Sequence, residues 1–383
     1  MNETSPSEPV TGARQLARVQ SLFERLRPVG TARDKAGNRQ LFCDQYVGLI
    51  LLSFFNPTLT SLRAMQKATE LDSVQRWLGL KRTVSLAALS EAGRVFEPDL
   101  LRGVLAELAA RVGPAALPEE REALRHLTAV DGTLLQVLPR MAHALWGDAG
   151  KLSAKLHLHF EVGRGIPVDG TVTPAADSEV AQLKGALQPG RLYVTDRGYA
   201  SYGLMADIIA KGSSFITRLR ADAVLRNAET QPLDDTARQA GVERDAMVRL
   251  GALGSGPKLP VRIVVVRPEP GVGRSDSPVI LCTDRFDLSA ELVVEAYRQR
   301  WQIELFFRWL KCILGCRHLI SHDLDGITFQ VYAALIASVL LSGATGRKPT
   351  KRTYEMFCHY FTGWATLEEV QRHIESLKEN KTG

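Results

Sequence analysis

The chain has 383 residues, of which 45% are hydrophobic and 23% are charged, and its formal net charge is +6. This length is sufficient for two or three domains with sizeable cores, and the composition excludes a disordered or fibrous protein. The basic balance favours a polyanionic partner. The cysteines are scattered and odd in number, which favours a reducing compartment over a disulfide scaffold and gives no zinc-ligand spacing: Cys43, Cys282, Cys312, Cys316 and Cys358.

The first nine residues are polar and lack the apolar segment of a signal peptide. The longest apolar runs, at 47–55 and 331–341, are too short to cross a bilayer and are typical of buried helices. We therefore expect a cytoplasmic protein with no membrane partner.

The N-terminal third has helix-like apolar periodicity over residues 41–110 and no strand signal. The sequence predicts a helical domain over residues 1–115, followed by a linker rich in Gly, Pro and Glu. Its basic side chains either contact DNA or form a solvated surface, and the pattern leaves both interpretations open.

The chain then changes to short apolar or alternating segments, which predict strands at 126–130, 155–162, 167–173, 192–195 and 214–218. Helices are expected at 178–187 and 202–211. Three strands, a helix, a strand, a helix and a strand form the order expected of a ribonuclease-H-like α/β core. We assign the first part of this core to residues 125–221.

Residues 222–283 contain turn signals and β-type runs and predict a β-rich insertion. A long helix is expected from residue 287 or 289 to about 314, with Gly315 as its C-cap. It opens the second part of the core, assigned to residues 284–345. Residues 346–383 form a helical C-terminal tail.

The long predicted helix carries Tyr297, Arg300, Glu304 and Lys311 on one face, because residues three, four and seven apart share a face. One interpretation is a solvated face on which Arg300 and Glu304 form an ion pair. The other is an active-site face, favoured because Glu304 is the one acid among several Arg and Lys residues. Trp301 lies on the same face and is either a base-stacking residue or part of the core.

Three carboxylates follow or accompany elements of the predicted core. Asp131 follows the first strand, Asp196 follows the fourth, and Glu304 lies on the long helix. Carboxylates from such positions can converge on a pair of divalent cations. Each Asp taken alone is more typical of a turn or a helix cap. Together with Arg300, which can fork onto a phosphate, they predict phosphoryl transfer.

The spacing Tyr297-x2-Arg300-x3-Glu304-x6-Lys311 resembles the Y-R-E-K signature of DDE transposases of the insertion-sequence-4 family. Asp131, within 128–133, looks like that family's first catalytic Asp, and Asp196, within 194–199, looks like its second. The similarity covers about residues 125–345 and includes a β-rich insertion between the second Asp and the Glu.

The resemblance implies cut-and-paste DNA transposition by Asp131, Asp196 and Glu304 with two Mg²⁺ ions, for which Mn²⁺ can substitute. The implied partners are double-stranded DNA, both the terminal inverted repeats of the element and the target, and a second copy of the chain in the DNA complex. Phosphate contacts are expected from Tyr297, Arg300, Lys311, Arg308 and Arg197. The implied location is the bacterial cytoplasm at the nucleoid.

Some members of that family place a Trp in the insertion to stack a flipped base, but residues 222–283 contain none. Phe286 or Trp301 would have to substitute, so the hairpin step stays open. Two other functions are compatible with the sequence: a catalytically silent, transposase-derived DNA-binding regulator, and a different nuclease on the same core. His157 and His159 share a strand face, where a packed or solvent-facing His is more common than a catalytic one.

Overall fold

The computed structural model describes residues 23–30, 39–114, 117–136, 153–251, 260–267, 278–312, 320–321 and 323–379. The chain divides into two compact units by contacts. One unit contains residues 1–112, 135–154 and 308–383, and the other contains residues 113–134 and 155–307. The predicted domains are consecutive segments of the chain, whereas each of these units combines segments that are distant in sequence. The two divisions are of different kinds, so the predicted domain boundaries stay predictions. The predicted helix end near Gly315, and Cys316, lie outside the described residues.

The described part of the first unit is mainly helical. Its helices are α2 (Leu26–Gly30), α3 (Cys43–Phe55), α4 (Leu62–Ala68), α5 (Asp72–Leu78), α6 (Leu86–Val95), α7 (Asp99–Arg111), α14 (Leu324–Thr345), α15 (Lys351–Phe361) and α16 (Leu367–Glu379). Serine side chains cap two of them, since Ser61 accepts from the amide of Ala64 and Ser85 accepts from that of Ala88.

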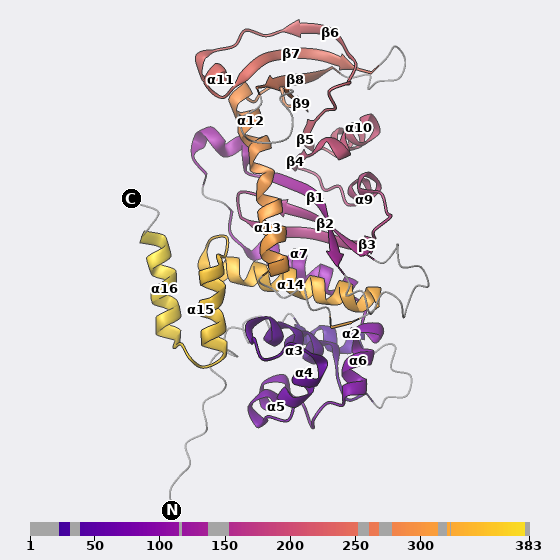
Figure 1. The fold of residues 1–383 in the computed structure, drawn as a ribbon, viewed down its shortest axis with the longest axis vertical. Helices are drawn as coiled ribbons and strands as arrows, with labels where there is room; N and C mark the ends of the chain where they lie inside the picture. The colour runs from indigo at the N-terminus through magenta and orange to yellow at the C-terminus, as the bar shows by residue number, and fades with distance from the viewer. Residues whose placement is uncertain are drawn as a thin grey trace, which may run out of the picture. The chain divides into compact units, whose positions relative to one another are not determined.

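Helix α14 forms the centre of this unit and contacts α3, α6 and α7 (Figure 1). It is buried around nearly its whole circumference, so its sequence has no polar face. By length and composition α14 could cross a membrane, but 83% of its most apolar window is buried within the protein. A buried core helix of a folded protein meets the same criteria, which makes the observation weak evidence for a membrane.

The second unit is built on one mixed sheet of nine strands in the order β3-β2-β1-β4-β5-β9-β8-β7-β6. The strands are β1 (Leu127–Gln136), β2 (Ser153–Glu161), β3 (Ile166–Pro174), β4 (Leu192–Thr195), β5 (Ser214–Arg218), β6 (Leu225–Thr230), β7 (Val242–Leu250), β8 (Val261–Val266) and β9 (Val279–Thr283). Strands β1, β4 and β5 are parallel, and β9 continues the sheet antiparallel to β5. Strands β4 and β5 begin and end where the sequence predicted them.

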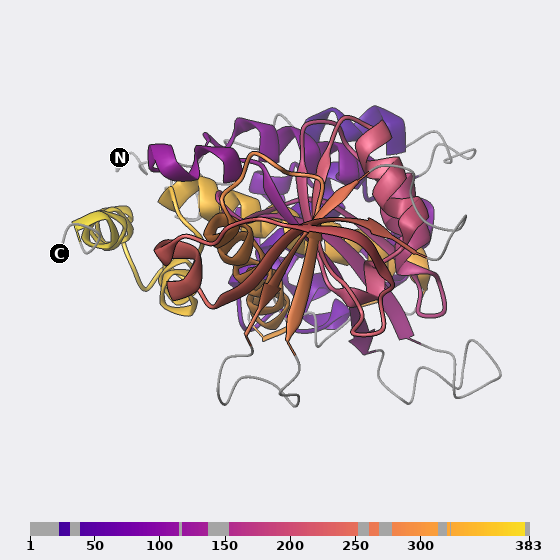
Figure 2. The ribbon, with the colours of Figure 1, turned by 90° about the horizontal axis from the view of Figure 1, so that it is seen from above.

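The remaining elements of this unit are η1 (Glu119–Leu124), α9 (Glu179–Gly185), η2 (Arg197–Tyr199), α10 (Tyr202–Ala210), α11 (Asp235–Gln239) and α12 (Ala290–Gln299), with α13 (Trp301–Cys312) beginning here. Helices α9 and α10 lie on one side of the sheet and α12 on the other (Figure 1). Viewed from above, the strands fan out with the usual sheet twist (Figure 2). Buried side chains of α9, α10 and the strands form one apolar core.

The region predicted as a β-rich insertion contains strands β6 to β9, and these strands pair into the same sheet as the predicted core. Arg262 of β8 and Asp245 of β7 form a buried ion pair, with Nη2 2.6 Å from Oδ2. The Arg262 guanidinium also donates to the carbonyl of Leu288, just before α12. This contact joins the insertion strands to the start of the helix that leads to Arg300.

The predicted long helix is divided at Arg300 into α12 and α13. The amide of Arg300 donates to the carbonyl of Tyr297, and the amide of Ile303 donates to that of Arg300. These bonds span three residues, which tightens the helix where the predicted site residues lie. The sequence showed no sign of this division, because the apolar periodicity continues across it.

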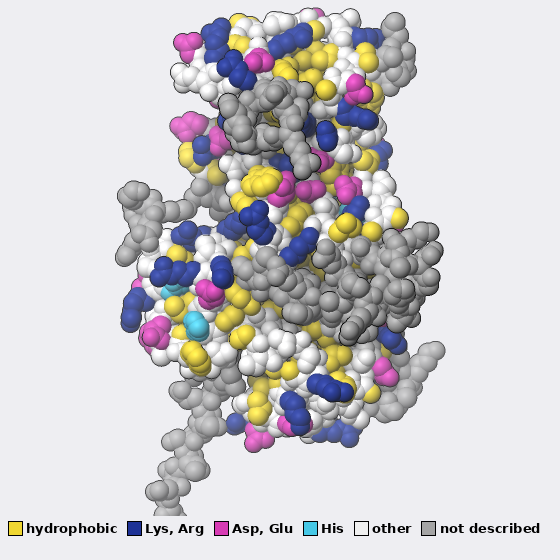
Figure 3. Space-filling model, in the orientation of Figure 1, with side chains coloured by type: hydrophobic (Ala, Val, Ile, Leu, Met, Phe, Trp, Pro, Cys, Tyr) yellow, Lys and Arg dark blue, Asp and Glu magenta, His cyan; other side chains and the backbone are white. Residues whose placement is uncertain are grey.

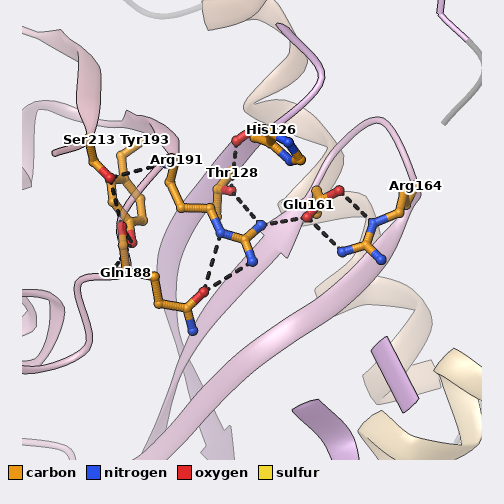
Figure 4. Close-up of polar contacts among 8 residues, drawn as sticks. All are labelled: His126, Thr128, Glu161, Arg164, Gln188, Arg191, Tyr193 and Ser213. Carbon is orange, nitrogen blue, oxygen red and sulfur yellow. Dashed lines mark hydrogen bonds and ion pairs between the residues drawn. The ribbon is translucent and has the colours of Figure 1, made fainter. Parts of the chain in front are cut away.

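A buried network of ion pairs and hydrogen bonds joins strands β1, β2 and β4 (Figure 4). Glu161, at the end of β2, accepts from Arg164 and from Arg191, each at a closest distance of 2.5 Å. Burial raises the pKa of Glu161, but the hydrogen bonds and charges of the two guanidinium groups outweigh it, and the pKa lies below its ordinary value. Arg191 also bonds Gln188, just before β4, and Thr128 of β1. The network therefore ties β2 and β4 to β1.

Candidate active site

Asp131 lies within β1, not after its end as the sequence predicted, because the strand continues to Gln136. Its Oδ1 accepts a hydrogen bond of 2.8 Å from the amide of Gly132. Its Oδ2 lies 3.6 Å from Nη1 of Arg300. These contacts orient the carboxylate with one oxygen toward the backbone and the other toward α13.

Asp196 follows β4, as predicted, and lies beside Asp131 in the sheet order. Ala129 of β1 pairs with Val194 of β4 in the parallel ladder, so both Asp residues stand two positions beyond the same pair. Adjacent strands lie about 4.8 Å apart. Asp196 also caps η2, because its Oδ1 accepts from the amide of Gly198 at 2.8 Å. Asp196 therefore caps η2 and also lies close to Asp131.

Glu304 lies in the first turn of α13 and forms an ion pair with Arg300, with Oε1 2.7 Å from Nη2. The ion pair of the alternative interpretation is therefore present. Ile303 and Phe306 are buried, and the Phe306 ring lies 5.0 Å from that of Phe160 on β2. This packing orients the helix so that Arg300, with 16% of its side chain exposed, bridges Asp131 and Glu304.

The surroundings of Asp131 change its pKa. Burial raises the pKa of Asp131 from 3.8 to about 6; the Gly132 hydrogen bond and the Arg300 charge oppose this shift, whereas the charges of Asp196 and Glu304 add to it. A carboxyl group displaced by burial and by like charges is typical of a functional site, although structural clusters show it too.

Among the described residues, no three His, Cys, Asp or Glu side chains are close enough together to hold a metal ion. The donor set nevertheless suits a hard divalent cation, which prefers carboxylate oxygens. Both Asp131 and Glu304 contact the guanidinium of Arg300, so these two carboxylates share one positively charged group. The chemistry of the site fits a metal, but within the part of the chain that the structure describes no three ligands are gathered around one point.

The other predicted site residues differ in their exposure to solvent. The Arg300 guanidinium lies 6.0 Å from the centre of the half-buried Tyr297 ring, and Arg197 is exposed. Trp301 is 50% exposed, which contradicts the interpretation as core, and Phe286 is 47% exposed. Arg308 and Lys311 belong to the part of α13 in the other unit, where Arg308 is exposed and Lys311 is half-buried. His157 and His159 are buried, which agrees with a packed role and not with a solvent-facing one.

The sequence did not reveal an ion pair beside Asp131. Nζ of Lys155, on β2, lies 3.1 Å from Oε1 of Glu179, the first residue of α9. No local pattern joins the two residues, since an acid in the first turn of a helix is common for its interaction with the helix dipole alone. Only the tertiary structure brings Lys155, Glu179 and Gly132 together.

Comparison with known proteins gives a family match and partial relatives. The family described as the transposase DDE domain matches residues 122–340, more than half of the chain. A Sinorhizobium fredii protein named as the transposase y4zB is 30% identical over 194 residues, 49% of this chain and 52% of the relative. A Geobacillus stearothermophilus protein named as a transposase for insertion sequence element IS5377 is 28% identical over 195 residues, 50% of this chain and 49% of the relative.

The chain thus aligns with about half the length of these two curated relatives. Among solved structures, a cryo-EM structure of the piggyBac transposase synaptic complex with hairpin DNA gives a TM-score of 0.37. The identity is 11%, over 96% of this chain and 82% of the other. A structural similarity at this level does not support a conclusion about the fold.

Proposed function

Because the chain belongs to the family of the transposase DDE domain, we propose that it is a DNA transposase that cuts and rejoins DNA at an Asp131–Asp196–Glu304 site. The observation that carries the proposal is the meeting of Asp131 and Glu304 on Arg300, with the charge of Asp196 acting on Asp131. Three carboxylates from β1, the end of β4 and α13 are the donors that two-metal phosphoryl transfer requires.

We also propose that the first five strands form a ribonuclease-H-like core. Two features support it: the order β3-β2-β1-β4-β5, and the parallel pairing of β1, β4 and β5. In this proposal β6 to β9 extend the core sheet. Membership of the insertion-sequence-4 family is a further proposal, supported by the spacing of Tyr297, Arg300, Glu304 and Lys311.

Asp131, Asp196 and Glu304 would hold divalent cations, Mg²⁺ or Mn²⁺, which supply activation of a water or 3′-hydroxyl and stabilisation of the leaving oxygen. The chain's own residues supply position and charge. Arg300 can present its planar fork to a DNA phosphate, and Tyr297 can donate a hydrogen bond to the same strand. Trp301 is 50% exposed, and an exposed indole can stack on a base.

DNA is the proposed partner, in the form of element ends and target. Lys and Arg side chains are spread over the described part of the face in Figure 3, and the chain has a net charge of +6. A positively charged surface supports phosphate contacts without base specificity. A homodimer in the DNA complex and a cytoplasmic location at the nucleoid are further proposals from the family resemblance.

The test is cleavage by the purified full-length chain of DNA carrying the sequences that flank its gene, with Mg²⁺. Wild-type protein should cut at the element ends. Asp196→Asn should show no detectable cutting, because the amide keeps the hydrogen bond to Gly198 but removes the charge. Asp222→Asn alters an Asp that is 79% exposed and serves as the matched control, with expected wild-type cutting.

Equal cutting by wild-type and Asp196→Asn protein would contradict the proposed site. DNA binding by wild-type protein without any cutting, under conditions that include Mn²⁺, would instead indicate the catalytically silent DNA-binding regulator. The two outcomes differ in whether wild-type protein cuts, so one experiment separates them.

A further inference from the structure

The ion pair of Lys155 and Glu179 is largely shielded from solvent. Lys155 has 16% of its side chain exposed and Glu179 has 32%. At this degree of burial, salt screens the pair less than it would an exposed pair. Two side chains from β2 and α9 are therefore held in one geometry next to β1.

The pair packs directly against Gly132. A Cβ atom added at Gly132 would lie 2.7 Å from Oε1 of Glu179 and 3.3 Å from Cδ of Lys155. A real Cβ would not tolerate the first distance, so a glycine is what allows the carboxylate to approach the β1 backbone so closely.

Gly132 in turn holds Asp131. Its amide donates to Oδ1 of Asp131, which leaves Oδ2 facing Arg300. Tyr199 is buried near all of these carboxylates. Burial is the largest cause of its raised pKa, and the charges of Glu179, Asp131 and Asp196 raise the pKa further. Its hydroxyl lies near Glu179 without a hydrogen bond of good geometry to any described residue. Glu179 thus shares its surroundings with both catalytic Asp candidates.

We propose that Lys155 and Glu179 are positioning residues of the active site, which hold the Gly132 peptide and through it the carboxylate of Asp131. Their catalytic consequence rests on the proposed function, but the contact with Gly132 does not. Partners that orient metal-binding side chains typically change metal affinity or activity by 10–100-fold when they are removed.

The first measurement is amide hydrogen exchange at Gly132 in the full chain without metal or DNA. Glu179→Ala should accelerate exchange by about tenfold or more, because the peptide loses its support and opens locally more often. Glu179→Gln can still pack on Gly132 and accept from Lys155, so its exchange rate should stay nearer to the wild-type rate. An unchanged rate in Glu179→Ala would overturn the proposal.

The second measurement is a double-mutant cycle on Mn²⁺ affinity by calorimetry and on the Mn²⁺ concentration for half-maximal cleavage. Gly132→Ala should displace Glu179, so Gly132→Ala and Glu179→Ala should each weaken the apparent affinity about tenfold. The double variant should be no weaker than Glu179→Ala, because the new Cβ then occupies vacated space. DNA affinity should not change.

The matched control is Asp207→Ala, which breaks the more exposed ion pair of Asp207 with Lys184 on α10 and α9. It should match wild type in each measurement. Independent, multiplying losses in the double variant would overturn the positioning role. Failure of wild-type protein to bind Mn²⁺ or cut DNA would contradict the proposed function, while the exchange rates at Gly132 would still decide whether Glu179 supports that peptide.

Discussion

At the scale of single residues, the ionised carboxylate of Asp131 destabilises the folded protein. Its carboxyl group is largely buried, and the charges of Asp196 and Glu304 act against its ionisation. Arg300 and the Gly132 amide compensate only in part, since the pKa stays raised at about 6. Such unfavourable charge interactions are common at positions where a residue is selected for function and not for stability.

Asp131→Asn should therefore stabilise the metal-free protein above pH 6. The folded protein keeps the proton up to about pH 6, whereas the unfolded chain loses it near 3.8, so this group lowers stability as pH rises through that window. A displacement of this size corresponds to at most about 3 kcal/mol, and partial exposure reduces the expected gain to about 1–2 kcal/mol.

Urea denaturation with EDTA at pH 4 and pH 8 checks this expectation. The difference between the variant and wild type should be largest at pH 8 and should shrink toward pH 4, where Asp131 is protonated in the folded protein. The Asn oxygen can still accept from Gly132, so the local hydrogen bond is retained. Equal stability of the two proteins at pH 8 would show that the Asp131 charge has no energetic cost.

At the scale of elements, the insertion strands fix the start of α12 through Arg262. This side chain is 9% exposed, pairs with Asp245 through two hydrogen bonds, and also donates to the backbone before α12. A buried ion pair adds little net stability compared with apolar residues, but breaking it leaves one buried charge without a partner. The arrangement of β7, β8 and α12 thus depends on both partners.

Arg262→Met should lower the free energy of unfolding by about 3–5 kcal/mol, because Asp245 then stays buried without its counter-charge. Arg267→Met, which removes an ion pair with Glu243 at 3.0 Å from an Arg that is 73% exposed, should cost less than about 1 kcal/mol. Urea unfolding of the two variants provides the comparison. Similar losses would indicate that the Arg262–Asp245 contact is not buried in solution.

The sequence predicted those elements whose signals are local. Strands β4 and β5 are short apolar runs bounded by turn residues, and their limits were predicted correctly. Asp131-Gly132 looked like a turn because that dipeptide favours turns, yet β1 continues through it beside β2. A strand between two neighbours in a sheet is stabilised by pairing with them, and no local pattern in the sequence contains that pairing.

The same distinction holds for the candidate site. Asp131, Asp196 and Glu304 were found from their places relative to predicted elements, and their catalytic role stays a prediction. The spacing did raise the ion pair of Arg300 with Glu304, but it did not predict the contact of Arg300 with Asp131 or that of Lys155 and Glu179 with Gly132. These contacts join residues from separate elements, and spacing along one chain carries no information about them.

At the scale of the whole molecule, the helical unit combines the two ends of the chain. The buried faces of α3, α6 and α7 pack on α14, more than 200 positions later in the sequence. Tyr354 of α15 donates to the carbonyl of Phe54 in α3. The N-terminal helices alone would expose the apolar surface that α14 covers, and that burial contributes about 25 cal/mol per Å².

A fragment of residues 1–112 should therefore not unfold cooperatively, despite its high helical propensity. Addition of a separate fragment of residues 308–383 should restore helical circular dichroism and a single thermal transition, because α14 then completes the core. The control is the same second fragment with Leu335→Asp, which places a charge at a fully buried position of α14 and should not complement. A sharp unfolding transition of residues 1–112 alone would show that this segment has a core of its own, and would favour the chain-order domain boundary near residue 115.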